Sequence, residues 1–319
     1  MENHPVRLAH FPITLFASVM GLSGLALAWK KAGHVLSLSY DPYLLFAGLS
    51  AAVFILLSLF YTLKFVRYAG EVKAEFMHPV KANFFPAVSI SLILLAALAL
   101  DISEMLAGIL FSLGAILQLS LTLVMFSRWV FAENHQNHHL TPAWFIPVVG
   151  NVLIPIVAVP LGLDELGWFF FSIGIVFWIV LFTILMHRLF FLDPMPLKLA
   201  PTLFILIAPP AVGFLSYLQL NGYIDNFAQV LYGVALFLTL FLLMQVHRFR
   251  KLPFFMSWWA YSFPLASISI ASLEYFRQTQ YQPVFWIAIS LLALATVVVM
   301  GLFMRTLIAM RNNQICVPE

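Results

Sequence analysis

The chain has 319 residues, of which 63% are hydrophobic and only 9% are charged, and its formal net charge is +3. Soluble domains have an apolar share of roughly 45 to 50% and a charged share of about 25%. The composition therefore excludes a soluble globular domain and predicts an integral membrane protein. The single cysteine, Cys316, also excludes an internal disulfide framework and a cysteine metal cluster.

Ten apolar segments, each near the length that a bilayer core requires, predict ten membrane-spanning helices. In chain order they cover residues 11–29, 43–63, 84–100, 105–127, 143–161, 166–187, 200–220, 226–247, 254–274 and 284–304. The stretch from Met1 to His10 lacks the pattern of a removable signal peptide, so we expect the first span to stay in the protein. The whole chain is expected to form a single transmembrane domain over residues 1–319.

The predicted spans alternate between two kinds of helix. The first member of each pair carries prolines, namely Pro12, Pro86, Pro147 with Pro155 and Pro160, Pro209 with Pro210, and Pro264. The second member has proline only at its first turn, as Pro42 and Pro283, where a missing N–H costs little. Asp41, Asp101, Asp164 and Asp225 recur about 60 residues apart before four of the second members, and we expect them to be N-caps. The pattern predicts an all-α fold of five helical hairpins, each with one bent and one straight helix.

The distribution of the 16 lysines and arginines predicts how the chain is oriented. Lys30, Lys31 and Arg277 follow the first members of two pairs. The other thirteen lie on the side of the two termini: Arg7, Lys64, Arg67, Lys73, Lys81, Arg128, Arg188, Lys198, Arg248, Arg250, Lys251, Arg305 and Arg311. The positive-inside rule therefore places both termini in the cytoplasm, in a bacterial-type inner membrane. The same residues give the inner mouth a positive field that concentrates anions, unless they serve topology alone.

None of the ten apolar segments contains Asp, Glu, Lys or Arg in its core. Glu274, His187, Arg188, His247 and Arg248 stand near helix ends and are interpreted first as rim groups. Carriers that couple transport to protons or sodium commonly place ionisable groups near the midplane. A path without charges predicts weak binding, fast passage and selectivity set by the cost of dehydration.

The proline-bearing helices are the expected lining of this path. Irregular backbone at membrane depth is tolerated where it faces protein or a water-filled cavity. The alternative is that the prolines only adjust helix packing. Carbonyls freed by proline also carry partial negative charge, and they would repel an anion unless they tilt away from the path.

A run near the end of the chain, from Trp258 to Ser267, reads WWAYSFPLAS. It resembles the ninth helix of the tellurite-resistance and dicarboxylate transporter family, which includes bacterial TehA and the slow-type anion channels of plant guard cells. Weaker matches follow in the same order along nearly the whole chain: Phe16, Gly21, Leu22 and 27–29, then 71–76 and 78–80, Gln118, Pro147, Asn151, 165–170, Ala208 and Pro209. Their order and spacing together are specific.

The resemblance implies a homotrimer in which each protomer has its own pore, lined by the odd-numbered helices of five hairpins in a quasi-fivefold arrangement. It also implies a phenylalanine that plugs the pore, and the matching residue is Phe263. An aromatic ring can fill a narrow lumen without bonding to water, and a rotamer change opens it. Pro264 follows the gate position, where some bacterial members have glycine.

Other candidates for the pore lining are Phe16, Ser89, Asn151, Pro209, Pro264 and Ser267, by their position in the repeat. For the serines and the asparagine, the alternative is a hydrogen bond to the backbone of their own or a neighbouring helix. His135, His138 and His139 could form a surface metal site, but only Glu133 lies beside them as a further ligand, and a solvated loop is the competing interpretation.

No metalloprotease motif, phosphate loop, nucleophile elbow or paired carboxylate is present, so an enzyme is not expected. Neither a cofactor nor a nucleic-acid partner is expected. The sequence predicts a gated, uncoupled channel for small monovalent anions such as nitrate and chloride, with inorganic anions and the lipid bilayer as its partners. The alternative is a secondary transporter that exports sulfite, tellurite-related oxyanions or C4-dicarboxylates. A sensory or scaffolding membrane protein would not need five proline-bent helices.

Overall fold

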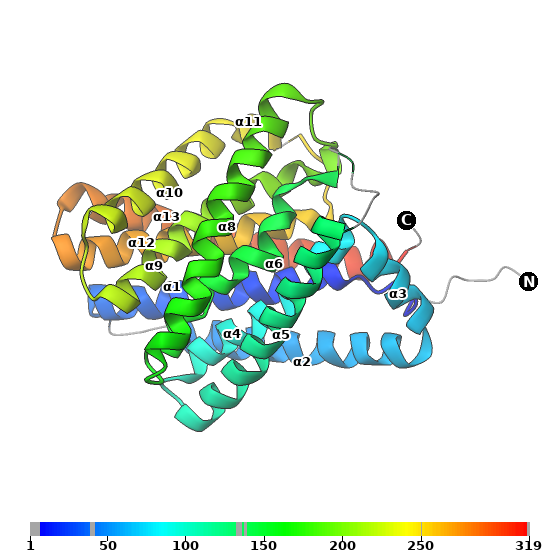
Figure 1. The fold of residues 1–319 in the computed structure, drawn as a ribbon, viewed down its shortest axis with the longest axis horizontal. Helices are drawn as coiled ribbons and strands as arrows, with labels where there is room; N and C mark the ends of the chain where they lie inside the picture. The colour runs from blue at the N-terminus through cyan, green and yellow to red at the C-terminus, as the bar shows by residue number, and fades with distance from the viewer. Residues whose placement is uncertain (1–6, 39–41, 132–135, 137–138, 250, 318–319) are drawn as a thin grey trace, which may run out of the picture.

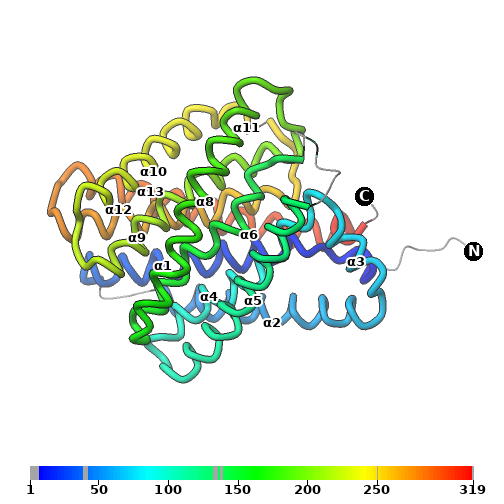
Figure 2. Tube along the Cα trace, viewed as in Figure 1, coloured from blue at the N-terminus to red at the C-terminus, as the bar shows by residue number. Residues whose placement is uncertain are grey.

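A computed structural model describes residues 7–38, 42–131, 136, 139–249 and 251–317. Throughout these residues the regular secondary structure is helical, which confirms the predicted all-α class. Two kinds of long helix alternate along the chain, as the proline pattern predicts. Figures 1 and 2 show their arrangement.

The first kind is the continuous helix, of which the described residues contain five, each 19 to 30 residues long. They are α2 (Tyr43–Arg67), α5 (Glu104–Phe131), α8 (Asp164–Phe191), α10 (Asn226–Met244) and α13 (Gln282–Arg311). None has a proline beyond its first turn, so the α-helical hydrogen bonding is unbroken.

The second kind is the composite helix, in which a 3₁₀ turn leads into an α-helix. The five composite helices in the described chain are η1 (Ile13–Leu15) with α1 (Phe16–Leu36); η2 (Lys81–Phe84) with α4 (Pro86–Ala99); η4 (Pro142–Trp144), α6 (Phe145–Val149), η5 (Gly150–Leu153) and α7 (Pro155–Ala158); η6 (Leu197–Ile207) with α9 (Ala208–Asn221); and η7 (Met256–Tyr261) with α12 (Ser262–Thr279). Two short helices, α3 (Ala69–Met77) and α11 (Val246–Phe249), lie between spans.

The prolines explain why the composite helices begin as 3₁₀ turns. In an α-helix the carbonyl of Ala82 would accept from the N–H of residue 86, which proline lacks. It accepts instead from the N–H of Phe85, one residue earlier, at 3.2 Å. The carbonyl of Ile205, four residues before Pro209, likewise accepts from the N–H of Ala208. The tighter hydrogen bonding therefore satisfies carbonyls that proline would leave without a donor.

The composite helices form a closed ring. α1 packs against α4, α4 against α7, α7 against α9, α9 against α12, and α12 against α1. Each continuous helix packs against the composite helix that precedes it. In Figures 1 and 2, α1 crosses the middle of the molecule, whereas α2 runs along its lower edge and α10 along its upper edge.

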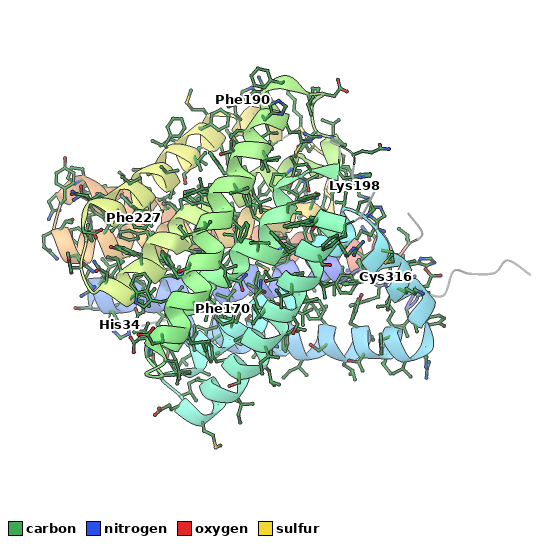
Figure 3. All side chains as sticks on the ribbon, viewed as in Figure 1. His34, Phe170, Phe190, Lys198, Phe227 and Cys316 are labelled. Atoms are coloured by element: carbon green, nitrogen blue, oxygen red, sulfur yellow. The ribbon has the colours of Figure 1, made fainter. Side chains whose placement is uncertain are left out.

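Burial separates the two rings. In the composite spans Ile13–Leu36, Lys81–Ala99 and Leu197–Asn221, 72%, 83% and 72% of the most apolar window is buried. In the five continuous helices the share is only 22 to 39%. Figure 3 shows Phe190 of α8 and Phe227 of α10 at the periphery. The composite helices are thus the interior and the continuous helices face the membrane.

Eight helices among the described residues are long and apolar enough to cross a membrane: the five continuous ones and three of the composite ones. The predicted spans 143–161 and 254–274 fall on the other two composite helices, of which Pro142–Ala158 is apolar but short. The chain is a multi-pass membrane protein, and the count of ten spans stays a prediction.

Of the three predicted N-cap aspartates among the described residues, one has that role. Asp225 is an N-cap, because its Oδ1 accepts from the N–H of Ala228 at 2.9 Å. Asp164 is instead the first residue of α8, and Asp101 forms an ion pair with Lys30 while the hydroxyl of Ser103 caps α5. Asp41 lies outside the described residues. The polar stretch 71–83 lies between two of the predicted spans, where no helix was predicted, but it contains most of α3 and all of η2 except its last residue.

Candidate functional site

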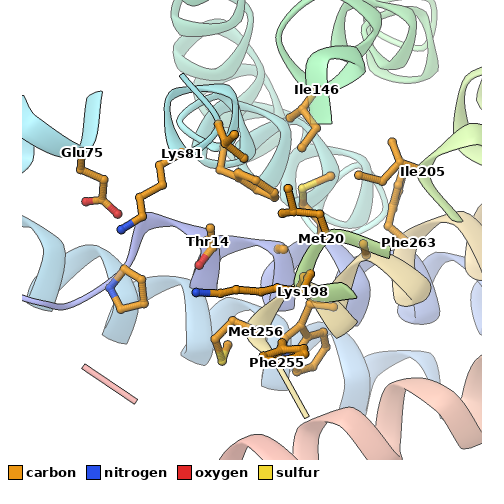
Figure 4. Close-up of a pocket in the computed structure, with 18 of the residues that line it drawn as sticks. Thr14, Met20, Glu75, Lys81, Ile146, Lys198, Ile205, Phe255, Met256 and Phe263 are labelled. Atoms are coloured by element: carbon orange, nitrogen blue, oxygen red, sulfur yellow. Dashed lines mark hydrogen bonds between the residues drawn. The ribbon is translucent and has the colours of Figure 1, made fainter. Parts of the chain in front are cut away.

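A cavity of about 1110 Å³ opens at one end of the ring and runs into it. The start of every composite helix contributes to its mouth: Thr14 of η1, Lys81 of η2, Ile146 of α6, Lys198 of η6 and Met256 of η7. Figure 4 shows these side chains around the opening. All five composite helices therefore start at the mouth, and the positive ends of their dipoles point towards it.

The cavity ends at five apolar residues, one from each composite helix. These are Met20 of α1, Ile90 of α4, Leu153 of η5, Val212 of α9 and Phe263 of α12, with Pro264 beside the last. No residue farther along any of these described helices lines the cavity. We call this set the apolar ring. It lies within the membrane-spanning part of the molecule and presents no charge to the cavity.

Phe263 is only 8% exposed, and its ring lies against a glycine of the neighbouring helix. A Cβ atom placed on Gly24 of α1 would stand 3.0 Å from Cδ2 of Phe263 and 3.1 Å from Cβ of Ala266. One turn earlier, a Cβ on Gly21 would collide with the hydroxyl of Ser262. The two glycines let α12 approach α1 closely, and this approach seats the Phe263 ring at the end of the cavity.

The start of the α12 composite helix is also fixed from its other side. The indole N–H of Trp259 in η7 donates to the hydroxyl of Thr306 in α13 at 2.9 Å, and both residues are buried. The hydroxyl of Ser262 donates to the carbonyl of Trp259 at 2.6 Å. The backbone that carries Phe263 is therefore held between α1 and α13.

The carbonyls of two prolines in the bends accept hydrogen bonds from side chains, one from a neighbouring helix and one from its own helix. The carbonyl of Pro147 accepts from Gln118 Nε2 at 2.8 Å and from the hydroxyl of Thr122 at 2.7 Å, both on α5. The carbonyl of Pro264 accepts from the hydroxyl of Ser267 at 2.8 Å. The carbonyls that a proline frees stand four residues before it, and those of Ala82 and Ile205 accept from N–H groups within the 3₁₀ turns, so they are not left without a donor.

A buried ion pair stands beside the mouth. Lys64 of α2 and Glu75 of α3 are 3% and 8% exposed, and Nζ lies 2.7 Å from Oε2. Lys64 also donates to the carbonyl of Phe11 at 2.8 Å, while Glu75 accepts from the N–H of Ile13 at 2.9 Å and from the hydroxyl of Tyr61 at 3.0 Å. This network fixes η1, where α1 begins, to the α2 and α3 segments.

The opposite end of the ring has a second charged network. Glu274 of α12 pairs with Lys31 of α1 at 2.9 Å and with Arg277 at 2.6 Å. Lys30 pairs with Asp101 at 2.7 Å. Each of the three basic residues predicted on the outer side thus contacts a carboxylate, but Lys31 and Arg277 share Glu274, so one positive charge of the three is left over.

Three of the seven predicted site residues line the cavity: Pro209, Phe263 and Pro264. Phe16 is buried with its ring against Phe54 and Tyr61 of α2. Whether any of the seven residues takes part in permeation stays a prediction.

The polar candidates engage in helix contacts. Ser89 donates to Pro86 O at 2.8 Å and to Gln118 Oε1 at 2.7 Å. Asn151 donates to the hydroxyl of Thr122 at 2.9 Å and to Val148 O at 2.7 Å. Ser267 bonds its own helix, as described above. None of the three lines the cavity, and their hydrogen bonds match the alternative weighed for them.

Sequence reasoning did not single out the other four members of the apolar ring, and it named Lys81 and Lys198 only among the thirteen basic residues of the inner side. Met20, Ile90, Leu153 and Val212 are ordinary apolar residues in apolar helices, so no local signal distinguishes them. Of the proposed histidine cluster, His135 and His138 lie outside the described residues. Among the described residues there is no group of three or more His, Cys, Asp or Glu that could hold a metal ion.

Residues 10–307 match the family profile SLAC1, described as voltage-dependent anion channel. The S-type anion channel SLAH3 of Arabidopsis thaliana is 30% identical over 308 residues, which are 94% of this chain and 48% of the plant protein. The guard cell S-type anion channel SLAC1 of the same plant is 27% identical over 94% of this chain and 56% of its own length. This chain thus spans about half the length of these plant relatives.

Two prokaryotic relatives match over most of both chains. The tellurite resistance protein TehA homolog of Haemophilus influenzae is 27% identical over 278 residues, which are 86% of this chain and 84% of that protein. An uncharacterized transporter of Methanocaldococcus jannaschii is 26% identical over 83% of this chain and 84% of its own length. The four matches cover 83 to 94% of this chain.

Proposed function

Because the chain belongs to the SLAC1 family of voltage-dependent anion channels, we propose that it is a gated, uncoupled channel for small monovalent anions such as nitrate and chloride, with Phe263 as the gate. The observation that carries the proposal is the cavity that ends at the apolar ring. Phe263 is the largest side chain of that ring, and its ring packs against Gly24.

The lining supports passage by dehydration. An anion that leaves the mouth meets Met20, Ile90, Leu153 and Val212, none of which offers a charge or a hydrogen bond. The energy of the passage is then governed by the water that the ion gives up. We expect nitrate to pass more easily than chloride and divalent sulfate to pass worst, because a doubly charged ion loses more on leaving water.

The mouth supports anions over cations. Five helix starts point their positive ends at it, and Lys81 and Lys198 stand there. In the proposed topology this is the cytoplasmic mouth, since Ala9 and Val317, near the two ends of the described chain, also line the cavity. We further propose an inner membrane location and a homotrimer of protomers with one pore each.

The direct test is the current carried by the purified protein in planar bilayers. Phe263→Ala removes the ring and should raise the basal anion current many-fold, whereas Phe263→Leu should raise it less because more of the constriction stays filled. Thermal unfolding of the same preparations is the companion measurement. If Phe263 were a packing residue only, the alanine change would cost about 3 to 5 kcal/mol of stability and add no current.

Reversal potentials in unequal salt, with and without a proton gradient, separate the channel from a coupled carrier. A channel gives a potential set by the anion gradient alone. A potential that follows the proton gradient, or sulfate passing as readily as nitrate, would favour the alternative, a transporter of sulfite, tellurite-related oxyanions or C4-dicarboxylates.

A further inference from the structure

The ion pair between Lys31 and Glu274 lies on the inner face of its two helices, beyond the apolar ring. Lys31 follows Met20 on α1 by 11 positions, and Glu274 follows Phe263 on α12 by 11 positions. Eleven residues make about three turns of α-helix with a rise of about 16 Å. Each residue of the pair therefore lies on the same helix face as the member of the apolar ring before it, farther along the same path.

Four donor contacts converge on the carboxylate of Glu274. Lys31 Nζ and Arg277 Nε each lie 2.9 Å from Oε2, while Arg277 Nη2 lies 2.6 Å and Gln278 Nε2 lies 2.9 Å from Oε1. Both oxygens are thus bound, and the guanidinium contacts them as a two-pronged fork. Because two cations face one carboxylate, the donors form an anion site that a side chain of the protein itself occupies.

The cations of this site are open to water, and the carboxylate is not. The side chains of Lys31 and Arg277 are 33% and 53% exposed, whereas that of Glu274 is 8% exposed. Figure 3 shows His34, in the last turn of α1, and Cys316, which lines the cavity, on opposite sides of the molecule. An anion can therefore reach the two cations from the side opposite the cavity.

We propose that Lys31, Arg277 and Gln278 form a binding site for planar oxyanions at the far end of the path, and that the carboxylate of Glu274 fills this site until such an anion displaces it. Nitrate and small carboxylates such as formate suit the site, because they present two oxygens in one plane as the side chain does. Chloride presents a single centre to the fork. The place of the site in permeation rests on the proposed channel function, whereas its binding of anions is measurable without a current.

Binding is tested by emptying the site. Glu274→Ala leaves Lys31 and Arg277 without their carboxylate, so the melting temperature of the protein in detergent should fall. Nitrate or formate should restore it by several degrees when either replaces chloride at constant ionic strength, because each binds the folded protein. The parent should show no such gain, since its site is filled. If the alanine variant does not fold, Glu274→Gln is tested in the same way.

The neighbouring ion pair provides the matched control. Asp101→Ala removes the carboxylate partner of Lys30 at the same end of the molecule. Lys30 offers one ammonium group, which also lies 3.5 Å from the carbonyl of Ala97, and no fork. Nitrate and formate should therefore stabilise this variant no more than chloride does. Adding Arg277→Gln to Glu274→Ala removes the fork and should abolish the restoration.

Currents distinguish a site in the path from a mechanical tie between α1 and α12. With Phe263→Ala as the conducting parent, Glu274→Gln removes the competing carboxylate and should raise the nitrate current several-fold at about 10 mM salt, where charges act over about 30 Å. Lys31→Gln breaks the same ion pair but removes a charge that attracts anions, so it should lower the current. At about 1 M salt, where the range is about 3 Å, both effects should fade. A mechanical tie predicts that both variants change the current in the same direction.

The site is refuted if nitrate and formate restore Glu274→Ala no more than they restore Asp101→Ala, or if Arg277→Gln leaves the restoration intact. Currents that change in the same direction in Glu274→Gln and Lys31→Gln would refute its place in the path. Failure of the channel proposal gives a different result, because Phe263→Ala protein would then carry no anion current. In that case the melting temperatures still decide whether the site binds oxyanions.

Discussion

The inner and outer rings of this molecule are both helical and both apolar, but they are apolar for different reasons. The continuous outer helices are the more hydrophobic by sequence and yet the less buried, whereas the composite inner helices are less hydrophobic and mostly buried. Outer side chains face lipid, so the outer helices must be apolar along their whole length. Inner side chains face other helices, where glycine, serine and asparagine can pack and hydrogen-bond. Hydrophobicity here reports contact with lipid and not depth in the protein.

The largest loss of stability is expected at the buried ion pair between Lys64 and Glu75, which joins η1 of the inner ring to α2 and α3. Lys64→Met leaves Glu75 buried without its cation, which should cost about 3 to 5 kcal/mol. Unfolding of the purified protein in detergent measures the loss. The Lys64→Met, Glu75→Gln double variant is the control and should be closer to the parent. Equal losses in the single and double variants would show that the pairing of the two charges is not what matters.

A matched pair of leucines compares the two rings directly. Leu25 of α1 is fully buried, and Leu25→Ala should cost about 2 to 5 kcal/mol through lost contacts and a cavity. Leu59 of α2 is 57% exposed, and Leu59→Ala should cost less than about 0.5 kcal/mol because lipid or detergent fills the space. A large loss at Leu59 would mean that protein covers it, as in the proposed trimer.

The smallest effect is expected at the start of an outer helix. The hydrogen bond from the N–H of Ala228 lowers the pKa of Asp225, and a second comes from the hydroxyl of Tyr217. A lowered pKa in the folded protein means that the contribution to stability is present above the ordinary carboxyl pKa and is lost as the pH falls through the lowered value. Asp225→Ala should therefore lower the melting temperature at neutral pH and less in acid. Asp225→Asn keeps an acceptor and should lower it less.

The positions of the prolines in the sequence predict the alternation of composite and continuous helices. Pro86 and Pro209 mark composite helices, and the spans expected around them fall on helices in the structure. The 3₁₀ form of their starts is not predictable from that pattern, since it depends on which N–H reaches Ala82 or Ile205. The helix α3 was missed because Glu71, Lys73 and Glu75 make it too polar for a membrane span and the partner of Glu75, Lys64, belongs to another helix.

At the site, resemblance to a family singles out Phe263, and the pattern of prolines adds Pro209 and Pro264. The rest of the apolar ring depends on which face of each helix points inward. Ile90 differs in no local way from Ile93, and only the closed ring of helices decides that Ile90 meets the cavity. The partners of the Pro147 carbonyl, Gln118 and Thr122, are likewise fixed by tertiary contact.

The close approach of α1 to α12 has a consequence for biosynthesis. Lys31 and Glu274, which join the two helices, are 243 positions apart, and Ile13 is bonded to a residue 62 positions later. At a synthesis rate of 5 to 20 residues per second, α1 emerges roughly 12 to 49 seconds before its partner. Among the described helices that qualify as membrane spans, the one containing α1 is the least hydrophobic, so it is the least stable alone in lipid. The ring closes only when α12 has been synthesised, so until then α1 stands in the membrane without the helix that packs on its glycine face.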